Sequence, residues 1–428
     1  FEFSDELLEA NPLQTPDGAS DIPLGGLSGL FFEGVADNGN LQFITHPDRG
    51  PDAGSQDVNG DGNDERIFVL PDFQPEIVRF EFNPNTGEIA ITDRIGLTRT
   101  DGTPLTGLPN LEGDDGGQQG ADAEGNLLDF DPFGADLEGI VVNPADDTFW
   151  MVDEYRPAIY HFDTDGTLID RFVPQGTDPD TTDDVTFGSE TLPEAYLSAR
   201  DNRGFEAVSL DTEEGILYAF IQTPLGTDGT NEFNSDVSAN SSVIRMLGID
   251  PATGTPVAEY VYLLEKPAFS EGNIDKIGDA TFAGDGKFFV VERDSGTSPT
   301  SNKVVYEINL SGATNVLGQT FEGTTLEQLT ADELAAEGIR PVSKTEVTNL
   351  PSLGYLTSET SDRPSDKPEG LALLPDGSLA VLNDNDFEPE NKETRLGIIS
   401  FDQTSQLFQP DADGDGITDA DDACPNVA

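Results

Sequence analysis

The sequence predicts an all-β fold: a β-propeller of five or six four-stranded blades, with long loop insertions and a short C-terminal calcium-loop tail. Three observations lead to it. Short runs rich in Val, Ile, Phe and Tyr alternate with Gly, Pro, Asp and Asn, which is the pattern of strands and turns. The runs group into four-stranded units at a long period. A carboxylate-rich motif recurs in these units, and a two-sheet sandwich, the alternative fold, explains that recurrence less well.

Five units follow one another along the chain, and a fourth strand in the fourth unit remains open. The predicted strands are Leu27–Phe32, Leu41–Thr45, Glu76–Phe82 and Ile89–Asp93; Ile140–Asn143, Thr148–Val152, Ala158–Phe162 and Leu168–Val173; Phe205–Leu210, Ile216–Ile221, Ser242–Ile249 and Val257–Leu264; Gly278–Phe282, Lys287–Val291 and Val304–Leu310; and Glu369–Leu374, Ser378–Leu382 and Leu396–Phe401.

The remaining segments complete or interrupt this ring. Phe1–Leu8 is predicted as a lone strand, because a closed ring of blades needs one to seal its last blade. Thr98–Phe133, Pro174–Arg203 and Gly312–Asp366 are predicted insertions with room for a sixth blade, and within the last of them Thr325–Glu337 is the one convincing helix.

The composition is strongly acidic, with 83 Asp and Glu against 21 Lys and Arg and a net charge of −62 over 428 residues. Such a field keeps a protein soluble, attracts cations and repels nucleic acid and anionic membranes, so no nucleic-acid partner is expected. We find neither a signal peptide nor an apolar run of the roughly 18 residues that span a bilayer. Because the chain starts at Phe1, we expect a processed mature form without membrane insertion.

Acidic residues recur at the edges of the strand pairs. In an antiparallel meander, the start of one strand and the end of the next lie at the same end of the sheet, so both sets are expected on one ring around the channel. The residues before the first strands are Ser28, Glu138, Glu206, Asp279 and Glu369. Those after the second strands are Asp48, Arg49, Asp153, Glu154, Thr223, Glu292, Arg293, Asp384, Asn385 and Asp386.

This ring predicts a cation site. Many like charges at close range need a cation, a proton or a basic side chain between them. All-oxygen ligands favour a hard ion, and Ca²⁺, with about six to eight loosely arranged ligands, fits better than Zn²⁺. The alternative interpretation is that these acids only cap strand ends and turns, as in any all-β protein.

Other chemistries find less support. The chain has no GxSxG elbow and no HExxH motif, which argues against a serine hydrolase of that type and against a His-rich zinc site. Of the two histidines, His161 lies inside a predicted strand and is expected to be structural. His46 lies next to the ring, and its role stays open.

The C-terminal tail carries a second calcium signal. Carboxylates stand at loop positions 1, 3, 5, 9 and 12, with Gly416 at position 6 for the sharp turn. The loop and the following Cys424 resemble a thrombospondin type 3 repeat. We therefore divide the chain into a domain of residues 1–408 and a partial repeat of residues 409–428. We expect this repeat to lead to further repeats or to self-association. The predicted ligands are Asp411, Asp413, Asp415, Asp419 and Asp422.

A partial loop of the same kind lies within the first unit. Asp57, Asn59 and Asp61 occupy the first ligand positions and Gly62 the turn, but Phe68 stands at position 12, so this loop needs another acid to reach in.

Several longer strings resemble the phytase-like family with esterase-like activity, in order from Gly25 to Phe401. The strings are GGLSGL (Gly25–Leu30), DLEGI (Asp136–Ile140), FWMVDEY (Phe149–Tyr155), NRGFEAV (Asn202–Val208), FFVVERD (Phe288–Asp294), KPEGLAL (Lys367–Leu373) and LAVLNDNDF (Leu379–Phe387). The resemblance implies a secreted bacterial propeller that hydrolyses phosphate or other esters.

By motif position, the resemblance also implies a set of site residues. The third unit departs from the pattern, having Gln222-Thr223 where an acid is expected. The implied residues are Asp48, Arg49, Glu138, Asp153, Glu154, Arg203, Glu206, Glu292, Arg293, Glu369 and Asp384.

The leading hypothesis is a secreted, extracellular or cell-surface hydrolase of small anionic phosphate esters that depends on Ca²⁺. One of Glu138, Asp153 or Glu154 would act as base, while arginines and Lys303 hold the anion. The competing hypothesis is a calcium-stabilised extracellular surface or matrix scaffold without catalysis. The candidate catalytic residues are Glu138, Asp153, Glu154, Glu206, Arg49, Arg203 and Arg293, and the candidate ring ligands of Ca²⁺ are Asp48, Glu292, Glu369 and Asp384.

Overall fold

The structure is a computed structural model that describes residues 1–110, 119–177, 188–227, 234–265, 274–321, 323–388 and 391–401. Strands dominate these residues, which confirms the predicted all-β class. Helical segments are short, and within the described residues no helix is long and apolar enough to cross a membrane. The helical segments of the described residues are α1 Asp5–Glu9, η1 Glu194–Ser198, α2 Ser235–Asn240, η2 Leu326–Gln328, α3 Ala331–Ala336 and η3 Leu350–Leu353.

Five sheets, which follow one another in chain order, form the body of the molecule. Their strands pair antiparallel, except that β14 pairs parallel with β13. The strands are β3 Leu27–Val35, β4 Leu41–Pro47, β7 Glu76–Phe82 and β8 Ile89–Gly96; β10 Leu137–Asn143, β11 Thr148–Asp153, β12 Ala158–Phe162, β13 Leu168–Pro174 and β14 Ser189–Leu192; β15 Phe205–Asp211, β16 Ile216–Ile221, β17 Val243–Asp250 and β18 Thr255–Leu263; β19 Lys276–Gly284, β20 Lys287–Arg293, β21 Lys303–Asn309 and β22 Ser343–Asn349; and β23 Lys367–Leu373, β24 Leu379–Asp384 and β25 Leu396–Ile399.

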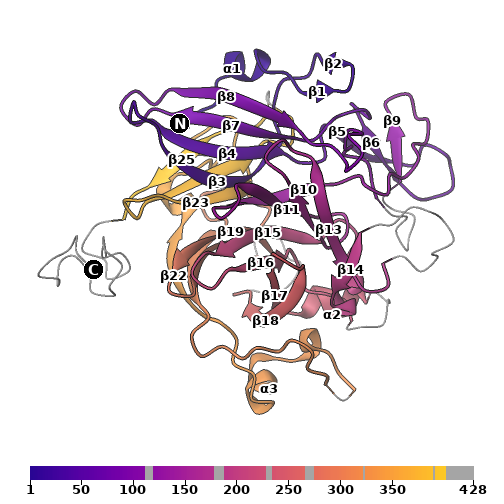
Figure 1. The fold of residues 1–428 in the computed structure, drawn as a ribbon, viewed down its shortest axis with the longest axis vertical. Coiled ribbons are helices and arrows are strands. Elements are labelled where there is room, and N and C mark those ends of the chain that lie inside the picture. The colour runs from indigo at the N-terminus through magenta and orange to yellow at the C-terminus, as the bar shows by residue number, and fades with distance from the viewer. Residues whose placement is uncertain are drawn as a thin grey trace, which may run out of the picture.

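The first strands of the five sheets form a closed cycle. Strand β3 contacts β10, β10 contacts β15, β15 contacts β19, β19 contacts β23, and β23 returns to β3. Figure 1 shows the sheets following this order around the molecule, from indigo to yellow. The fold is therefore of the β-propeller type, with these five strands innermost.

Small residues let the inner strands approach closely. A Cβ added at Gly139 in β10 would lie 2.7 Å from the backbone nitrogen of Val208 in β15, and one added at Gly370 in β23 would lie 2.8 Å from Cβ of Leu30 in β3. The pairing register of every inner strand also shifts at this level. A bulge changes the direction in which the neighbouring side chains point. In each inner strand, the alternation of side chains between the two faces of the sheet is therefore interrupted next to the residue predicted for the ring.

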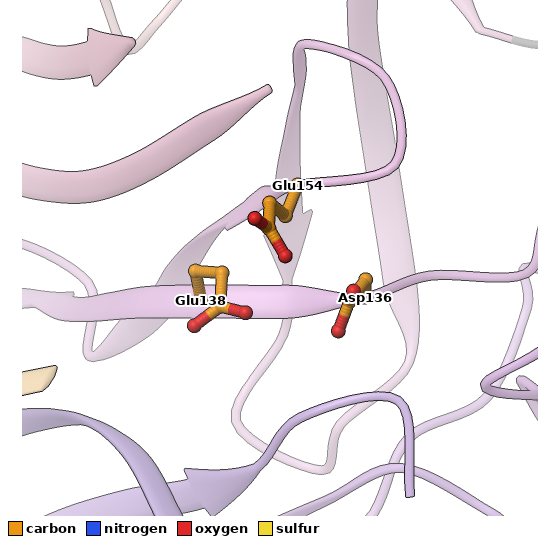
Figure 2. A group of neighbouring side chains, drawn as sticks. All are labelled: Asp136, Glu138 and Glu154. Atoms are coloured by element: carbon orange, nitrogen blue, oxygen red, sulfur yellow. The ribbon is translucent and has the colours of Figure 1, made fainter. Parts of the chain in front are cut away.

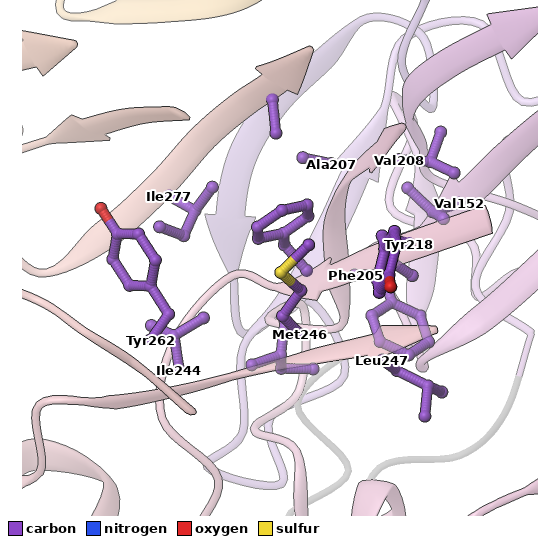
Figure 3. Packing of buried hydrophobic residues seen from close by; sticks show 14 of the residues in the cluster. Val152, Phe205, Ala207, Val208, Tyr218, Ile244, Met246, Leu247, Tyr262 and Ile277 are labelled. Carbon is purple, nitrogen blue, oxygen red and sulfur yellow. The ribbon is translucent and has the colours of Figure 1, made fainter. Parts of the chain in front are cut away.

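Neighbouring sheets pack face to face through apolar clusters. Figure 3 shows part of the largest cluster, to which Phe205 and Val208 of β15, Met246 of β17, Ile277 of β19 and Val152 of β11 belong. This packing joins the second, third and fourth sheets. Burial of such side chains is the main force that holds the blades together.

The N-terminal segment closes the ring only in part as predicted. Glu2 forms a β-bridge with Arg395, and the backbone nitrogen of Phe3 donates to the carbonyl of Thr394 at 2.9 Å, so the first residues extend the fifth sheet. The predicted strand is wrong beyond Ser4, because residues 5–9 form α1. Ser4 caps this helix by accepting from the backbone nitrogen of Leu7 at 3.2 Å.

The insertions hold additional small elements. Strands β5 Asp52–Gln56, β6 Glu65–Phe68 and β9 Gly120–Asp122 form a separate three-stranded sheet, and β1 Gln14–Thr15 pairs with β2 Gly18–Ala19. The described parts of the insertions add no further sheet to the ring.

The predicted helix Thr325–Glu337 is divided into η2 and α3. The division falls at Thr330, whose hydroxyl accepts from the backbone nitrogen of Glu333 at 3.3 Å while the Glu333 carboxylate reaches back to Thr330. This capping box starts a new helix within the predicted one. Strand β22 supplies the fourth strand that the sequence left open in the fourth sheet.

Candidate functional site

A cavity of about 520 Å³ lies at the end of the ring where the inner strands begin. Of the acids predicted for the ring, Asp48, Glu138, Glu154, Glu369 and Asp386 line it. Basic side chains from all parts of the chain converge on the same cavity. They are Arg49, Arg66, Arg203, Lys276, Arg293 and Lys367.

Three buried carboxylates gather on one side of this cavity. Ligand atoms of Asp136, Glu138 and Glu154 all lie within 4.8 Å of one another. Figure 2 shows that Asp136 and Glu138 come from the start of β10, whereas Glu154 follows β11. The meander brings these strand ends together, as the sequence predicted for Glu138 and Glu154.

Arginines neutralise two of these three acids. Arg49 pairs with Asp136, and Arg203 Nη1 lies 2.7 Å from Glu154 Oε1. Burial raises the pKa of Asp136 to about 7, although Arg49 acts against it. Burial also acts to raise the pKa of Glu154, but the guanidinium groups of Arg203 and Arg49 outweigh it and hold this pKa below its usual range.

Glu138 has no such partner among the described residues. Its carboxylate accepts a hydrogen bond from the hydroxyl of Ser28, and no basic side chain of the described chain lies within ion-pair distance. Burial, followed by the charges of Glu206 and Glu369, raises its pKa well above the ordinary value. Glu138 is therefore a position in the cavity where a proton or a cation would relieve repulsion between carboxylates.

Arg293 joins two further ring acids. Its Nη2 lies 3.4 Å from Glu206 Oε1 and contacts Glu369, and Gln222 Nε2 donates to the other oxygen of Glu206 at 2.6 Å. A Cβ added at Gly278 would lie 2.4 Å from the carbonyl oxygen of Pro368, so the absence of a side chain there lets β19 approach β23 next to the arginine. In the fourth sheet an arginine thus lines the cavity where the second sheet presents Glu154.

Lys367 compensates the acids that follow β24. Its Nζ lies 2.8 Å from Asp384 Oδ2 and also contacts Asp386. Burial raises the pKa of Asp384 to about 8 despite this lysine. Burial, with the charges of Asp384 and Asp136, raises the pKa of Asp48 well above its usual value.

Several predicted site residues are not brought to the cavity. Asp153 is fully buried and accepts from Asn110 Nδ2 at 2.6 Å and from the backbone nitrogen of Tyr155 at 3.0 Å, with Arg171 at 3.7 Å. Successive side chains of a strand point to opposite sides, so Glu154 faces the cavity while Asp153 faces the protein interior.

The same alternation separates Glu292 from Arg293. Glu292 is buried between the hydroxyl of Tyr262 and the ammonium of Lys344 and does not line the cavity. Lys303 pairs with Asp294 and lines a different, smaller cavity. Neither Glu292 as a cavity calcium ligand nor Lys303 as an anion ligand is therefore supported by the geometry.

Asp279 is also displaced from the predicted ring. Its carboxylate accepts from the backbone nitrogen atoms of Ala280 and, across the sheets, of Leu371 at 2.6 Å. It connects the fourth and fifth inner strands instead of facing the cavity, because the bulge in β19 shifts the register at this point.

Both histidines lie outside the cavity lining. His46 is buried, with Nδ1 3.0 Å from the carbonyl of Pro47, and burial lowers its pKa to about 4. His161 stacks on Trp150 with ring centroids 4.0 Å apart, as expected of a structural residue.

The partial calcium loop forms a compact turn. Asp57 accepts from the backbone nitrogens of Gly60 and Gly62, at 2.6 and 3.1 Å, and Asn59 Nδ2 donates to Glu65 at 2.7 Å. Phe68 is buried, but Glu65 reaches back into the loop. Calcium binding by Asp57, Asn59 and Asp61 stays a prediction. So do the tail ligands Asp411, Asp413, Asp415, Asp419 and Asp422 and the boundary at residue 409, which lie outside the described residues.

The sequence motifs did not assign several residues of the site, among them Arg66, Asp136, Asn202, Lys276 and Lys367. Asn202 has a left-handed backbone, with φ of 54°; its Oδ1 accepts from Arg49 Nη1 at 2.6 Å and its Nδ2 donates to Glu154 Oε2 at 2.8 Å. Asp136, Asn202 and Lys367 stand within the motifs quoted above, one or two positions from residues that were assigned, and Lys276 opens β19.

Together, the ring of inner strands and the charged cavity at its mouth define a β-propeller-type protein with a deeply buried ionic site. The chain belongs to the phytase-like family, whose model, described as esterase-like activity of phytase, matches residues 22–387. An uncharacterized secreted protein of Arthroderma benhamiae is 25% identical over 382 residues, which cover 76% of this chain and 70% of that protein.

Solved structures show weaker similarity. The periplasmic gluconolactonase of Pseudomonas aeruginosa is 11% identical, with a TM-score of 0.33 and coverage of 87% of this chain and 88% of that one. A glucose dehydrogenase is 10% identical, with a TM-score of 0.35 and coverage of 91% and 89%. At these scores the likeness carries no argument, and the fold described above rests on the strand topology.

Proposed function

We propose that this protein is a secreted hydrolase of phosphate esters that works in the 520 Å³ cavity with the help of Ca²⁺. One observation carries the proposal. Six of the chain's 21 Lys and Arg residues line this single cavity beside eight Asp and Glu residues, whereas the whole chain has 83 acids against 21 bases. Such an enrichment in bases within an acidic molecule favours an anionic ligand. Membership of a phytase-like family and a secreted relative support the reaction class and the location.

The carboxylate group beside these bases fits a hard cation. Asp136, Glu138 and Glu154 offer oxygen ligands within 4.8 Å of one another, and Glu138 has no basic partner among the described residues. Oxygen donors of this kind suit Ca²⁺. When bound there, the cation would polarise the phosphorus–oxygen bonds of the substrate and offset the charge that develops during hydrolysis.

The side chains of the protein then have separate tasks. Basic groups hold the phosphate oxygens. The oxygen of a water molecule attacks phosphorus, and one of its protons passes to Glu138 or Glu154. The bond from phosphorus to the ester oxygen breaks, the leaving alkoxide takes up a proton from solvent, and the carboxyl group releases the proton that it received back to solvent. Of the three predicted bases, Glu138 and Glu154 line the cavity and Asp153 does not, so the proposal drops Asp153 from this role.

The competing hypothesis is a calcium-stabilised scaffold. It predicts a channel mouth filled by side chains, whereas this mouth is an open cavity whose bases face it. That observation favours an enzyme.

The test is an assay of the purified protein on a phosphate monoester, on phytate and on a carboxylic ester, each with Ca²⁺ and with chelator at fixed ionic strength. We expect phosphate release that requires Ca²⁺. Release that is equal in chelator would remove the cation from the proposal, hydrolysis of the carboxylic ester alone would change the substrate class, and no hydrolysis at all would favour the scaffold.

A further inference from the structure

Three basic side chains crowd one wall of the cavity. Arg203 lies two residues before the start of β15, while Lys276 and Arg293 face each other in the pairing of β19 with β20. Strands β15 and β19 are neighbours in the ring, and all three residues line the cavity. Adjacent strand ends therefore bring three positive charges together from two sheets.

These charges repel one another. Burial lowers the pKa of Lys276, and the nearby charges of Arg293 and Arg203 lower it further, although Asp275 acts in the opposite direction. Lys276 Nζ donates to Ser295 Oγ at 2.9 Å and lies 3.1 Å from Asp275 Oδ1, which leaves this lysine only partly compensated.

Arg293 adds an unused donor. Its side chain is 4% exposed, and its Nη2 is engaged by Glu206 and Glu369. Its Nε is buried without a hydrogen-bond partner among the described residues. A buried donor of this kind costs free energy unless a ligand satisfies it.

The other bases of the cavity are separated from one another by the acids that they pair with. Arg49 contacts Asp136, Asp52 and Asn202, and Lys367 lies between Asp384 and Asp386. Arg203, Lys276 and Arg293 also have acidic partners, since Arg203 pairs with Glu154. They differ in that the positive charges of Arg203 and Arg293 act directly on Lys276.

We propose that Arg203, Lys276 and Arg293 form the subsite that binds the phosphate group of the substrate. The inference rests on the proposed function for the identity of the ligand, a phosphate monoester. An oxyanion at this wall would relieve the repulsion between the three charges and give further acceptors to the guanidinium and ammonium donors, as phosphate does at Arg and Lys side chains elsewhere. Lys276 is the member that the sequence motifs did not indicate.

The test measures binding of inorganic phosphate by calorimetry in chelator, so that neither turnover nor calcium phosphate interferes. Lys276→Met removes the charge with little change in shape, and Lys303→Met is the matched control: a buried lysine of the same sheet that lines another cavity. We expect Lys276→Met to weaken phosphate binding about tenfold or more, from loss of a charge-assisted contact, and Lys303→Met to leave it unchanged.

Equal affinity in the two variants, or no phosphate binding by the unsubstituted protein, would overturn the subsite. If Lys276→Met fails to fold, the affinity for inorganic phosphate is measured in Arg293→Lys, which retains a positive charge for Glu206 and Glu369. This variant should also bind phosphate more weakly. The result is separable from the proposed function. Phosphate binding that depends on Lys276 without any ester hydrolysis would retain the subsite and reject the enzyme, whereas hydrolysis with unchanged binding in Lys276→Met would do the reverse.

Discussion

At the scale of single residues, the cavity holds several buried ion pairs together with acids, Glu138 and Asp48 among them, for which the described residues supply no ion pair. Arg49 with Asp136 and Arg203 with Glu154 are examples of the pairs. Taking two charges out of water costs several kcal/mol per ion, and a buried pair often only recovers that cost. Such pairs contribute little to stability, so their concentration in one cavity indicates a functional site. We place the centre of this site at Glu138, which has no ion-pair partner among the described residues.

The first prediction concerns His46. Its folded pKa of about 4 is below its usual value of 6.5, so the folded state binds fewer protons than the unfolded state between these values. The free energy of unfolding should therefore fall as pH drops from 6.5 to 4, by about 3 kcal/mol from this residue. Urea unfolding in chelator at several pH values, for the unsubstituted protein and His46→Gln, measures it.

Carboxylates also titrate in this range, so the comparison between the two proteins isolates the histidine. His46→Gln should show a pH dependence smaller by the stated amount. Identical pH dependence in both would mean that His46 is not buried as a neutral imidazole.

At the scale of elements, the ring is closed by the first residues of the chain. Phe3 is 1% exposed and packs edge-on against Phe80 of the first sheet with ring centroids 5.1 Å apart, while its backbone joins the fifth sheet. It thus connects the two sheets where the ring meets itself.

The second prediction is that Phe3→Ala destabilises the protein by about 3 to 5 kcal/mol, because it opens a cavity at this junction. Phe1→Ala is the control, since Phe1 is 48% exposed, and it should cost much less. Equilibrium denaturation of both variants makes the comparison. Similar, small losses in both would show that the N-terminal segment does not seal the ring.

Most strands were predictable because apolar and β-branched runs between turn residues mark them directly. The sheet of β5, β6 and β9 was missed because its strands are short and because β5 and β9 consist of Gly, Ala and polar residues. For the site, the sequence predicted which pairs of adjacent residues end a strand near the cavity, but not which member of each pair lines it. In Asp153-Glu154 or Glu292-Arg293 the two side chains point to opposite sides of the strand. A bulge adds a residue to the strand and reverses which of the two faces the channel.

At the scale of the whole molecule, the charge of −62 makes cations part of the stability. The third prediction is that chelator lowers the melting temperature at fixed ionic strength, because bound Ca²⁺ stabilises the folded state by mass action, by about 2.7 kcal/mol at a hundred times its dissociation constant. Ionic strength must be matched, since screening alone reduces the repulsion. A melting temperature that is the same in Ca²⁺ and in chelator would exclude a stabilising calcium site.

The fourth prediction tests most directly that hydrolysis occurs in the cavity, by comparing Glu138→Gln with Glu292→Gln on a phosphate ester in saturating Ca²⁺. Glu138 lines the cavity, whereas Glu292 is buried between Tyr262 and Lys344. We expect Glu138→Gln to lower kcat/KM by about a hundredfold or more, the scale of a lost acid–base group, without loss of stability. Glu292→Gln should lower the melting temperature but keep the activity of the folded fraction, and the reverse pattern, or full activity in Glu138→Gln, would place the chemistry elsewhere.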